Sequence, residues 1–167
     1  MYYKSYYKSP LGQISIICDD SSLCGLYFHD QKYYEKGFEN SDLVEDETAI
    51  HKVVKLALDD YFLGDDRTLK NISIKPKGTP FQEKVWYALK DISFGHTTTY
   101  GELAKKMNCQ SAQAVGGAIG RNPIAIVIPC HRVLGKNGEL TGYVAGVDCK
   151  KWLLNHEKEE KKDDYFL

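Results

Sequence analysis

The apolar residues of this chain repeat first with the period of a strand and then with the period of a helix, and this change of period limits the folds that the chain can adopt. Tyr2–Lys8 and Gln13–Cys18 alternate apolar with polar residues, as half-buried strands do. The turn signal Ser9-Pro10-Leu11-Gly12 lies between them and predicts a β-hairpin. Leu23–His29 is a third candidate strand, whereas apolar residues three and four apart over Glu47–Gly64 predict one face of a helix. The predicted fold class is therefore α/β of the α+β type.

A domain boundary is predicted at Lys75-Pro76-Lys77-Gly78, where proline and glycine interrupt both patterns. Residues 1–77 are expected to form an N-terminal α/β structural domain with a mixed sheet and a helix, and Leu69–Ile74 is expected to be a short strand in it. Residues 78–160 are expected to form a mostly helical C-terminal domain. Residues 161–167 are expected to be a charged tail.

Helices are predicted at the start of the C-terminal domain from their capping residues. One is expected to begin at Pro80, a residue type favoured at the first helical position, and to end at Phe94-Gly95. Ser111 can cap a helix over Ala112–Ile119, which follows the predicted helix Tyr100–Met107 after a three-residue turn. A helix, a short turn and a helix of small residues predict a helix-turn-helix. Ordinary close packing of two helices is the alternative, and the pattern alone does not decide between them.

Composition and charge narrow the classes of protein. The five cysteines are odd in number and include no Cys-x-x-Cys pair, so the sequence indicates neither a disulfide framework nor a zinc ribbon. A reducing compartment is expected, namely the cytoplasm, or the nucleus in a eukaryote. No apolar run approaches the roughly 18 residues of a membrane-spanning helix, so no membrane partner is expected. Residues 79–152 hold nine Lys and Arg against five Asp and Glu, a basic balance that permits a polyanionic partner.

The segment that carries chemistry is Ile126–Val133, which contains proline, cysteine, histidine and arginine in succession. Ile126–Ile128 is predicted to be a short buried strand that Pro129 ends, because proline lacks an amide hydrogen. Cys130 would follow on a rigid turn, beside an imidazole and a guanidinium. Nearby cationic or hydrogen-bonding groups favour the nucleophilic thiolate form of a cysteine. The alternative is that Cys130 is a small buried apolar residue, the usual role of a free cysteine.

The segments around Cys130 suggest supporting loops and a final helix. Gly135-Lys136-Asn137-Gly138 is predicted to be a hairpin turn. Leu140–Gly146 combines small residues with an aromatic one and suits a pocket wall. Val147–Glu157 is predicted to be the last helix. Asn122 precedes a proline, which is a turn signal, and its side-chain amide can tie loops together.

Over Thr79–Glu157 the chain resembles the catalytic domain of the 6-O-alkylguanine-DNA alkyltransferases, the one-use DNA repair proteins. Six ordered segments carry the resemblance: Thr99–Ala104, Ala114–Ala118, Asn122-Pro123, Ile128–Val133, Thr141–Tyr143 and Lys151–Glu157. The N-terminal third resembles the family's first domain more loosely, mainly through Ser9–Gly12. The resemblance implies a ribonuclease-H-like N-terminal domain and a winged-helix-like C-terminal domain that contains the helix-turn-helix.

The resemblance also implies a reaction. An alkyl group would pass irreversibly, in a single turnover, from O6-alkylguanine in DNA, and from O4-alkylthymine, to a cysteine of the protein. Matching positions make Cys130 the nucleophile, His131 a base acting through a water, and Glu157 the group that orients His131. Tyr100 matches the tyrosine that helps to rotate the target nucleotide and to protonate the leaving base. Asn122 would hold the turn that carries Cys130, and no cofactor is implied.

The same resemblance implies a base pocket and a DNA-binding surface. Val133, Tyr143, Val144 and Ala145 would line the pocket, with the Val133 carbonyl accepting a hydrogen bond from the guanine amino group. A monomer would bind double-stranded DNA through the minor groove, with the target base flipped out of the duplex. The residues expected at the DNA surface are Tyr100, Ala112, Gln113, Ala114, Gly116 and Arg121.

The chain departs from the family's pattern at two points. The family has an arginine at position 113, which fills the stack that the flipped base leaves. Gln113 can fill space there and hydrogen-bond the orphaned cytosine, but it has no charge. Some members also bind zinc in the N-terminal domain. Because Cys18, Cys24 and His29 have irregular spacing and no clear fourth ligand, no metal site is expected.

Two other classes of function stay open on the sequence. A lesion-binding module without transfer activity would share the fold, although relatives of that kind lack the cysteine. A cysteine hydrolase would also use a cysteine and a histidine, but nothing in the sequence indicates an oxyanion hole or a peptide substrate. Alkylated DNA would leave a stable adduct on Cys130 only if the protein is an alkyltransferase.

Overall fold

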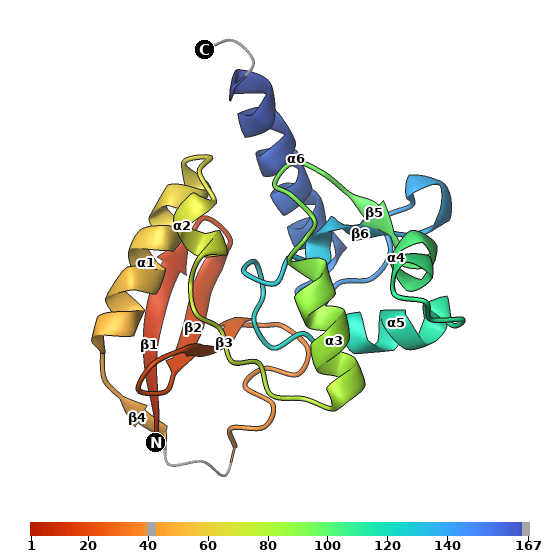
Figure 1. Ribbon diagram of the computed structural model, residues 1–167. Coiled ribbons are helices and arrows are strands. Elements are labelled where there is room, and N and C mark those ends of the chain that lie inside the picture. Colours follow the sequence, from red (N-terminus) through yellow and green to blue (C-terminus); the bar gives the residue numbers. More distant parts are fainter. Residues whose placement is uncertain (40–42, 165–167) are drawn as a thin grey trace. The chain divides into compact units, whose positions relative to one another are not determined.

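The computed structural model describes residues 1–39 and 43–164 (Figure 1). The chain forms two compact units. The first consists of Met1–Lys77 with Pro123–Val127, and the second consists of Gly78–Asn122 with the chain from Ile128 onward. A sheet dominates the first unit and helices dominate the second, so the predicted α+β fold class is confirmed.

The first unit contains a mixed sheet. Its strands are β1 (Tyr2–Ser9), β2 (Gly12–Cys18), β3 (Leu23–Phe28) and β4 (Leu43–Glu45). They lie in the order β3-β2-β1-β4, with β4 parallel to β1 and the other neighbours antiparallel. The predicted hairpin between β1 and β2 is confirmed. Gly12 has a φ of 104° in its turn, a conformation that glycine adopts without the steric penalty of a side chain.

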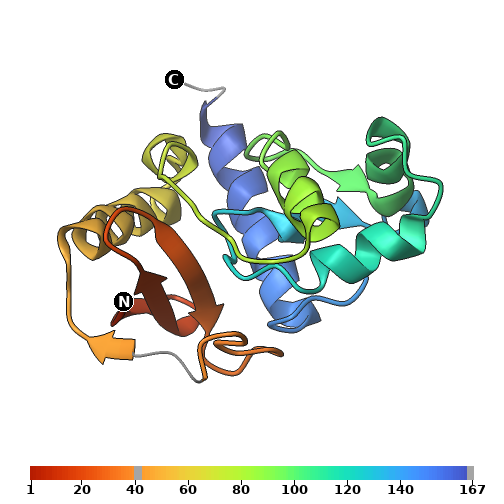
Figure 2. The same cartoon turned by 60° about the horizontal axis from the view of Figure 1, so that its bottom comes forward.

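Helix α1 (Ala49–Phe62) packs against this sheet, as Figure 2 shows. The side chains that it buries have the three-and-four spacing of one helix face and are His51, Val54, Ala57, Leu58 and Tyr61. The backbone N–H of Thr48 donates to Nδ1 of His51 at 3.0 Å and so caps the helix start. Nε2 of the same imidazole lies 3.1 Å from the carbonyl oxygen of Ile16 in β2. The predicted apolar face therefore covers the sheet through Val54, Ala57, Leu58 and Tyr61, whereas Val53 of the same pattern is 49 % exposed.

The predicted strand Leu69–Ile74 is wrong. A short helix, α2 (Arg67–Lys70), occupies its first residues, and Leu69 is buried there. Pairing with the sheet is confined to the end of the segment, where Ile74 forms a parallel bridge to Leu23 in β3. Leu69 and Ile72 are both buried and three residues apart, a spacing that puts them on one face of a helical turn but on opposite faces of a strand.

The predicted strand Ile126–Ile128 is also wrong. Ile124 forms a parallel bridge to Leu26 in β3, through hydrogen bonds at Pro123 (2.9 Å) and Ala125 (3.0 Å), but the chain then leaves the sheet. The N–H of Val127 bonds back to the carbonyl of Ala125 at 2.8 Å, and Ile126 has a φ of 69°, which is rare for a β-branched residue. These apolar side chains are buried because the turn is enclosed, and an apolar run cannot distinguish an enclosed turn from a buried strand.

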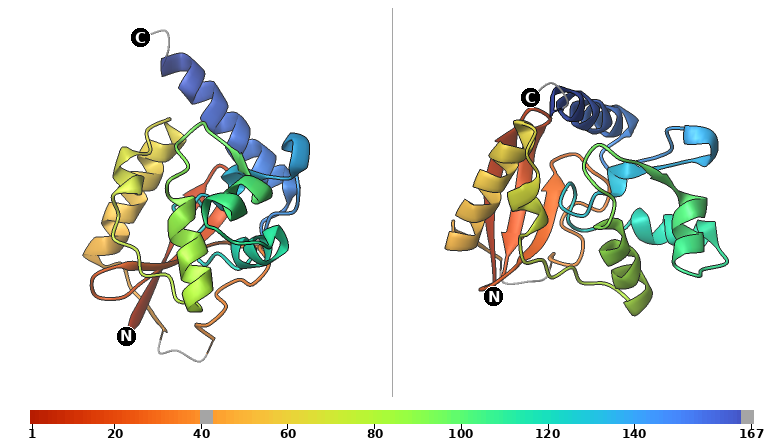
Figure 3. Two further views of the ribbon diagram at one scale, coloured as in Figure 1. Left: turned by 45° about the vertical axis from the view of Figure 1, so that its right-hand side comes forward. Right: turned by 45° about the horizontal axis from the view of Figure 1, so that its top comes forward.

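The second unit is built on the helices α3 (Pro80–Leu89), α4 (Tyr100–Lys106), α5 (Ala112–Ile119) and α6 (Val147–Asp164). The hydroxyl groups of Thr79 and Ser111 cap α3 and α5 by accepting backbone N–H groups at 3.1 and 3.0 Å. Figures 1 and 3 show α4 and α5 side by side, joined by a short turn. This pair is the helix-turn-helix that the capping residues predict.

Two helix ends differ from the prediction. Helix α3 ends at Leu89 rather than at Phe94-Gly95, because the next three N–H groups bond three residues back and tighten the chain into turns. Helix α6 passes its predicted end at Glu157 and continues to Asp164. Its last residues are mostly Lys and Glu, which favour helix over an extended tail. Residues 165–167 of the predicted tail lie outside the described residues.

A small parallel sheet, β5 (Thr98–Thr99) with β6 (Val133–Leu134), joins the start of α4 to the chain after Cys130. The predicted hairpin turn Gly135–Gly138 is wrong, because β6 pairs with β5 rather than with a following strand. The chain instead forms a 3-10 turn at Lys136–Gly138, closed by a hydrogen bond from the N–H of Gly135 to the carbonyl of Glu139 at 2.8 Å.

The core of the second unit lies between the inner faces of its helices. Trp86 of α3 is its largest buried side chain, and its indole Nε1–H donates to the carbonyl of Ala118 in α5 at 2.8 Å. The indole therefore contributes both apolar area and a satisfied polar group to the core. Other buried apolar residues here are Val85, Leu89, Leu103, Val115, Ile119, Ile128, Val133 and Leu153.

Candidate active site and DNA-binding helix

Cys130 begins a 3-10 turn, Cys130–Arg132, directly after Pro129. Its N–H donates to the carbonyl of Ile128 at 2.8 Å, and the side-chain amide of Asn122 donates to the same carbonyl at 2.8 Å. Asn122 is buried, so its amide ties the turn from the inside. Successive side chains of a 3-10 turn lie about 120° apart, so Cys130 and His131 do not point in opposite directions as they would on a strand.

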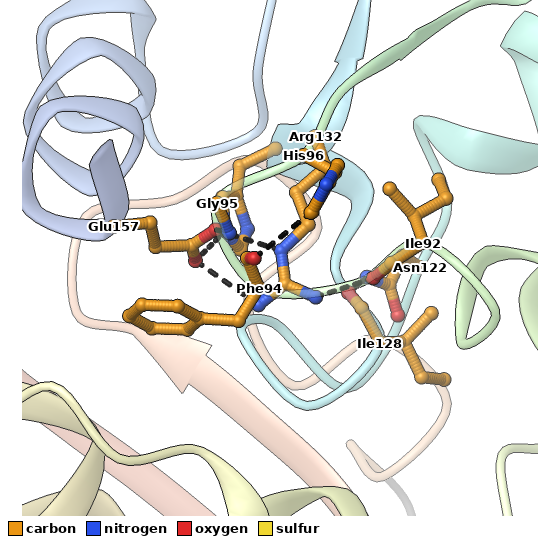
Figure 4. A network of polar contacts seen from close by, with 9 residues as sticks. Ile92, Phe94, Gly95, His96, Asn122, Ile128, Arg132 and Glu157 are labelled. Atoms are coloured by element: carbon orange, nitrogen blue, oxygen red, sulfur yellow. Dashed lines mark hydrogen bonds and ion pairs between the residues drawn. The ribbon is translucent and has the colours of Figure 1, made fainter. Parts of the chain in front are cut away.

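An ion-pair network lies beside Cys130, and Figure 4 shows the carboxylate of Glu157 facing the guanidinium of Arg132. Arg132 donates from Nε to Oε1 of Glu157 at 2.8 Å and from Nη2 to Oε2 at 3.2 Å. Its Nη1 donates to the carbonyl of Ile92 at 2.6 Å, and its guanidinium lies 5.8 Å from the ring centre of Phe94. Nε2 of His131 lies 2.5 Å from Oε2 of Glu157. The imidazole is therefore held by a carboxylate that is itself held by an arginine.

The charges in this network follow from burial and from the partners. Burial opposes ionisation of Glu157, but the charges and hydrogen bonds of His131 and Arg132 outweigh it and hold the pKa of that carboxyl well below 4.5. Burial lowers the pKa of His131 below 6.5, although the carboxylate of Glu157 acts in the opposite direction. We therefore assign an ionised Glu157 and a neutral His131 whose Nε2–H donates to Glu157. Within the described residues, Nδ1 of His131 is buried without a hydrogen-bond partner.

Cys130 is buried, with 3 % of the residue exposed. Burial raises its pKa, while the amide of Asn122, the ammonium of Lys150 and the phenol of Tyr143 act to lower it. Because the net direction is upward, the thiol is the resting form at neutral pH and needs a base to become a nucleophile. The neutral imidazole of His131 is a candidate base, because it follows Cys130 in the same turn.

Tyr100 begins α4, and its phenol faces two side chains that come from later in the sequence. Its hydroxyl oxygen lies 3.0 Å from Oγ1 of Thr141. The Nζ atom of Lys150 lies over its ring, 5.9 Å from the ring centre. The phenol at the start of α4 and the thiol and imidazole of the 3-10 turn therefore come from two segments of one unit of the fold.

The four residues that the resemblance places in a base pocket follow the 3-10 turn. Val133 lies in β6 and is buried, whereas Tyr143, Val144 and Ala145 are half-buried. The rings of Tyr143 and His131 are 6.5 Å apart and nearly perpendicular. The structure thus brings Tyr143 close to His131, while Val144 and Ala145 lie on the adjoining loop.

Two buried cations of this site were missed by the sequence analysis as functional residues. Arg132 belongs to the conspicuous Pro-Cys-His-Arg segment, but nothing in the sequence shows that it pairs with Glu157. Lys150 is 1 % exposed on α6. Its spacing was a usable signal, because Lys150, Leu153 and Glu157 are three and four residues apart and therefore share one helix face.

Helix α5 has one buried face and one exposed face. Val115, Ala118 and Ile119 are buried. On the opposite side, Ala112, Gln113 and Ala114 are exposed, Gly116 is half-exposed, and Arg121 is exposed just beyond the helix. A Cβ atom on Gly116 would lie 3.6 Å from the Tyr100 ring, so this helix also borders the phenol. A helix with an exposed face of small residues allows a partner to approach its backbone closely.

The described residues contain neither a cluster of metal ligands nor a membrane-spanning helix. In residues 1–39 and 43–164, no group of three or more His, Cys, Asp and Glu residues is arranged to hold a metal ion. Burial raises the pKa of Cys18 to about 12 and that of Cys24 to about 11, while His29 is exposed on the surface. The expected absence of a metal stays a prediction for elemental analysis. In the described part of the chain, no helix has the length and apolarity of a membrane span.

Comparisons with known proteins identify relatives of both halves of the chain. Residues 80–159 match the family model for the 6-O-methylguanine DNA methyltransferase, DNA binding domain. Residues 1–76 match the family model for the 6-O-methylguanine DNA methyltransferase, ribonuclease-like domain.

Full-length relatives agree with these matches. The methylated-DNA--protein-cysteine methyltransferase of Haemophilus influenzae is 43 % identical over 157 residues, which is 93 % of this chain and 86 % of that protein. The one from Methanosarcina acetivorans is 42 % identical over 94 % of this chain and 98 % of its own length. The crystal structure of Mycobacterium tuberculosis OGT in complex with DNA superimposes with a TM-score of 0.81 at 35 % identity, covering 95 % of this chain and 93 % of that one. The chain therefore belongs to the 6-O-methylguanine DNA methyltransferase family and is a DNA-binding methyltransferase of DNA repair.

Proposed function

We propose that this protein removes alkyl groups from O6-alkylguanine in double-stranded DNA by transferring them irreversibly to Cys130. A thioether is stable in water, so each molecule acts once. O4-alkylthymine carries the same kind of alkyl–oxygen bond and is the second expected substrate. The observation that carries the proposal is a buried Cys130 thiol in the same turn as a neutral His131 held by an ionised Glu157.

The thiol is activated by His131. Nε2–H of the imidazole donates a hydrogen bond to Glu157, so Nδ1 is the nitrogen able to accept a proton. The Cys130 proton passes to Nδ1 through one water molecule, and Glu157 stabilises the imidazolium that forms. The sulfur then attacks the alkyl carbon, so that a C–S bond forms as the C–O6 bond breaks. The electron pair of the broken bond passes to the guanine.

The leaving guanine needs a proton to depart as a neutral base. Tyr100 supplies that proton, and it also helps to rotate the nucleotide out of the duplex. The carbonyl of Val133 accepts a hydrogen bond from the guanine amino group, while Tyr143, Val144 and Ala145 form the pocket wall. Asn122 keeps the cysteine turn in place through its hydrogen bond to Ile128.

Residues 78–160 are the proposed DNA-binding and alkyl-transfer domain. The exposed face of α5 lies in the minor groove of the duplex, and the protein binds as a monomer. The reactive carbon is inaccessible inside the duplex, so the base is flipped out at a cost of a few kcal/mol. Ala112, Ala114, Gly116 and Arg121 contact the duplex, with Gln113 at the gap that the flipped base leaves.

The deciding experiment is mass spectrometry of the intact protein and its peptides after incubation with duplex DNA that contains O6-methylguanine. We expect one methyl group per chain, located on Cys130. Bound DNA with no adduct would indicate a lesion-binding module. Turnover of a carbonyl substrate without a stable adduct would indicate a hydrolase. Either result would overturn the proposal.

Pocket size is tested by Ala145→Trp. The half-buried Ala145 leaves room for bulky groups, so the parent chain should accept benzyl as well as methyl. Tryptophan should slow benzyl transfer by about 10–100-fold, as overpacking by about 1–3 kcal/mol would, and spare methyl transfer. Single-turnover rates with both lesions give the comparison. Leu140→Trp, at an exposed position of the same loop, should change neither rate. Equal losses for both lesions would exclude Ala145 from the pocket wall.

The helix assignment is tested by Gln113→Arg. Arginine adds a charge that attracts phosphates and a plane that can stack, a contribution of about 1–3 kcal/mol per base. We expect roughly tenfold tighter duplex binding and faster repair of the duplex, whereas Gln113→Ala should weaken both. The free alkylated base needs no flipping, so its rate should not change. Gln110→Arg adds the same charge in the turn before α5 and should give a smaller effect. Equal shifts on duplex and free base would contradict this role.

A further inference from the structure

The hydroxyl of Thr141 is bonded to the phenol that is proposed to protonate the leaving base. The two oxygen atoms, Oη of Tyr100 and Oγ1 of Thr141, lie 3.0 Å apart, and both side chains are half-buried. Each hydroxyl can donate and accept, so the direction of this hydrogen bond is free to reverse during a reaction. Among the described residues, Thr141 is the one whose contact with Tyr100 is at the hydroxyl oxygen, whereas Lys150 and Gly116 lie against the ring.

The position of Thr141 is set by its own surroundings. A Cβ atom placed on Gly135 would lie 2.7 Å from Cγ2 of Thr141, so the threonine methyl packs directly on the glycine backbone. Gly135 is in turn fixed by the hydrogen bond between its N–H and the carbonyl of Glu139. Because the methyl group occupies this space, the hydroxyl group is directed by the loop rather than free to rotate about the side chain.

The ring of Tyr100 is held by different elements. Gly116 of α5 borders it on one side, where a Cβ would meet Cδ1 at 3.6 Å. The Nζ atom of Lys150 from α6 lies 5.9 Å from the ring centre. These contacts fix the ring plane but not the hydroxyl hydrogen. Thr141 therefore controls the one feature of the phenol that the other contacts leave open.

We propose that Thr141 is a positioning residue for alkyl transfer, which rests on the function proposed above. Before the reaction it holds the Tyr100 hydroxyl in place. As the C–O6 bond breaks, the phenol proton passes to the guanine and its electron pair stays on the phenol oxygen. The Thr141 O–H then donates to this phenolate, and the Lys150 ammonium lies over the same ring. Both interactions stabilise negative charge where it develops.

Three variants test this role. Thr141→Val keeps the branched shape and removes the hydroxyl, so it should slow single-turnover methyl transfer about tenfold or more, as expected for losing a hydrogen bond to a charged oxygen. Thr141→Ser keeps the hydroxyl and should stay within about twofold of the parent rate. Thr97→Val, at an exposed position, makes the same chemical change elsewhere in the unit and should have no effect.

A double-mutant cycle with Tyr100→Phe separates positioning from a structural role. If Thr141 acts through the phenol oxygen, adding Thr141→Val to Tyr100→Phe should cause no further loss of rate. Melting temperature and duplex affinity should be unchanged by Thr141→Val.

Several results would overturn the inference while the proposed function stands. They are a parent-like rate for Thr141→Val, equal losses for the valine and serine variants, and a further loss in the double variant. A parent chain that forms no adduct on Cys130 would instead refute the proposed function itself, so the two failures are distinguishable.

Discussion

Cys130→Ser is expected to bind methylated duplex DNA as tightly as the parent chain and to lose methyl transfer. The loss should be at least about 10⁴-fold, since removal of the nucleophile from another covalent enzyme costs about 10⁶-fold. A serine hydroxyl ionises far less readily than a thiol, and its oxygen is a harder nucleophile for an alkyl carbon. Burial already raises the pKa of the Cys130 thiol, so a still weaker acid at this position cannot be ionised by His131.

Radioactive methyl transfer and duplex affinity, measured on the same preparation, check this prediction. Cys109→Ser is the matched control, because it removes a thiol from the turn before α5 and leaves the site intact. Its transfer rate should equal that of the parent chain. Methyl transfer by Cys130→Ser at a rate near that of the parent would show that another residue accepts the alkyl group.

Elements with local signals were predicted well from the sequence. The β1–β2 hairpin is specified by alternation on both sides of a Pro-Leu-Gly turn, which are all short-range features. Helix α5 begins after Ser111 as predicted, because the capping hydroxyl and the first helical N–H groups are neighbours in the chain. Such features depend little on the rest of the fold, so a single sequence contains the information for them.

Elements defined by distant partners were predicted less well. Ile126–Ile128 is apolar because an enclosed turn buries it, and the turn is visible only in the structure, from the hydrogen bond of Val127 to Ala125 and the positive φ of Ile126. Leu69–Ile74 was predicted wrongly because the segment is short and apolar, while its buried residues Leu69 and Ile72 have the three-residue spacing of a helical turn. Gly135–Gly138 does form a turn, but the strand before it pairs with β5 instead of returning on itself.

Some contacts of the candidate site could be expected from the sequence, and others depend on partners that are distant in the chain. The resemblance to a family suggested His131 and Glu157, which are 26 positions apart, and the structure joins them at 2.5 Å. Arg132 and Thr141 could not have been assigned from the chain alone, because their partners lie on other segments. Lys150 could have been found, since it shares a helix face with Glu157 and a lysine on a buried face is unusual.

Glu157→Gln is expected to reduce both the free energy of unfolding and the rate of transfer. Glu157 is 1 % exposed and accepts hydrogen bonds from His131 and Arg132. The side-chain amide of glutamine has an NH2 group in place of one carboxylate oxygen, so it cannot accept one of the hydrogen bonds from His131 and Arg132. It also leaves the buried guanidinium of Arg132 without a neutralising charge. Removing one partner of a buried ion pair costs about 3–5 kcal/mol. His131 also loses the group that fixes its tautomer, so transfer should fall by about 10²–10⁴-fold, the contribution of a positioned base.

The pH dependence of stability gives a second readout of the same substitution. The folded pKa of Glu157 lies below its ordinary value of 4.5, so its stabilisation is present above pH 4.5 and is lost as the pH falls through the lower folded value. The difference in unfolding free energy between the parent chain and Glu157→Gln should therefore be largest near neutral pH and should shrink below pH 4.5. The lowered pKa of His131 removes stability from the parent at pH values below 6.5, because the unfolded imidazole binds a proton that the folded one does not.

Denaturant unfolding from pH 3 to 8, with single-turnover rates at each pH where the protein is folded, provides the measurement. Glu159→Gln is the matched control, since it removes the same charge from an exposed position two residues further along α6. This variant should change neither quantity by more than about 0.5 kcal/mol or its rate equivalent, as is usual for an exposed site. A Glu157→Gln variant as stable and as active as Glu159→Gln would show that the carboxylate neither supports the Cys130–Arg132 turn nor orients His131. Reduced stability with an unchanged transfer rate would limit Glu157 to a structural role and would exclude the His131–Glu157 pair from the activation of Cys130.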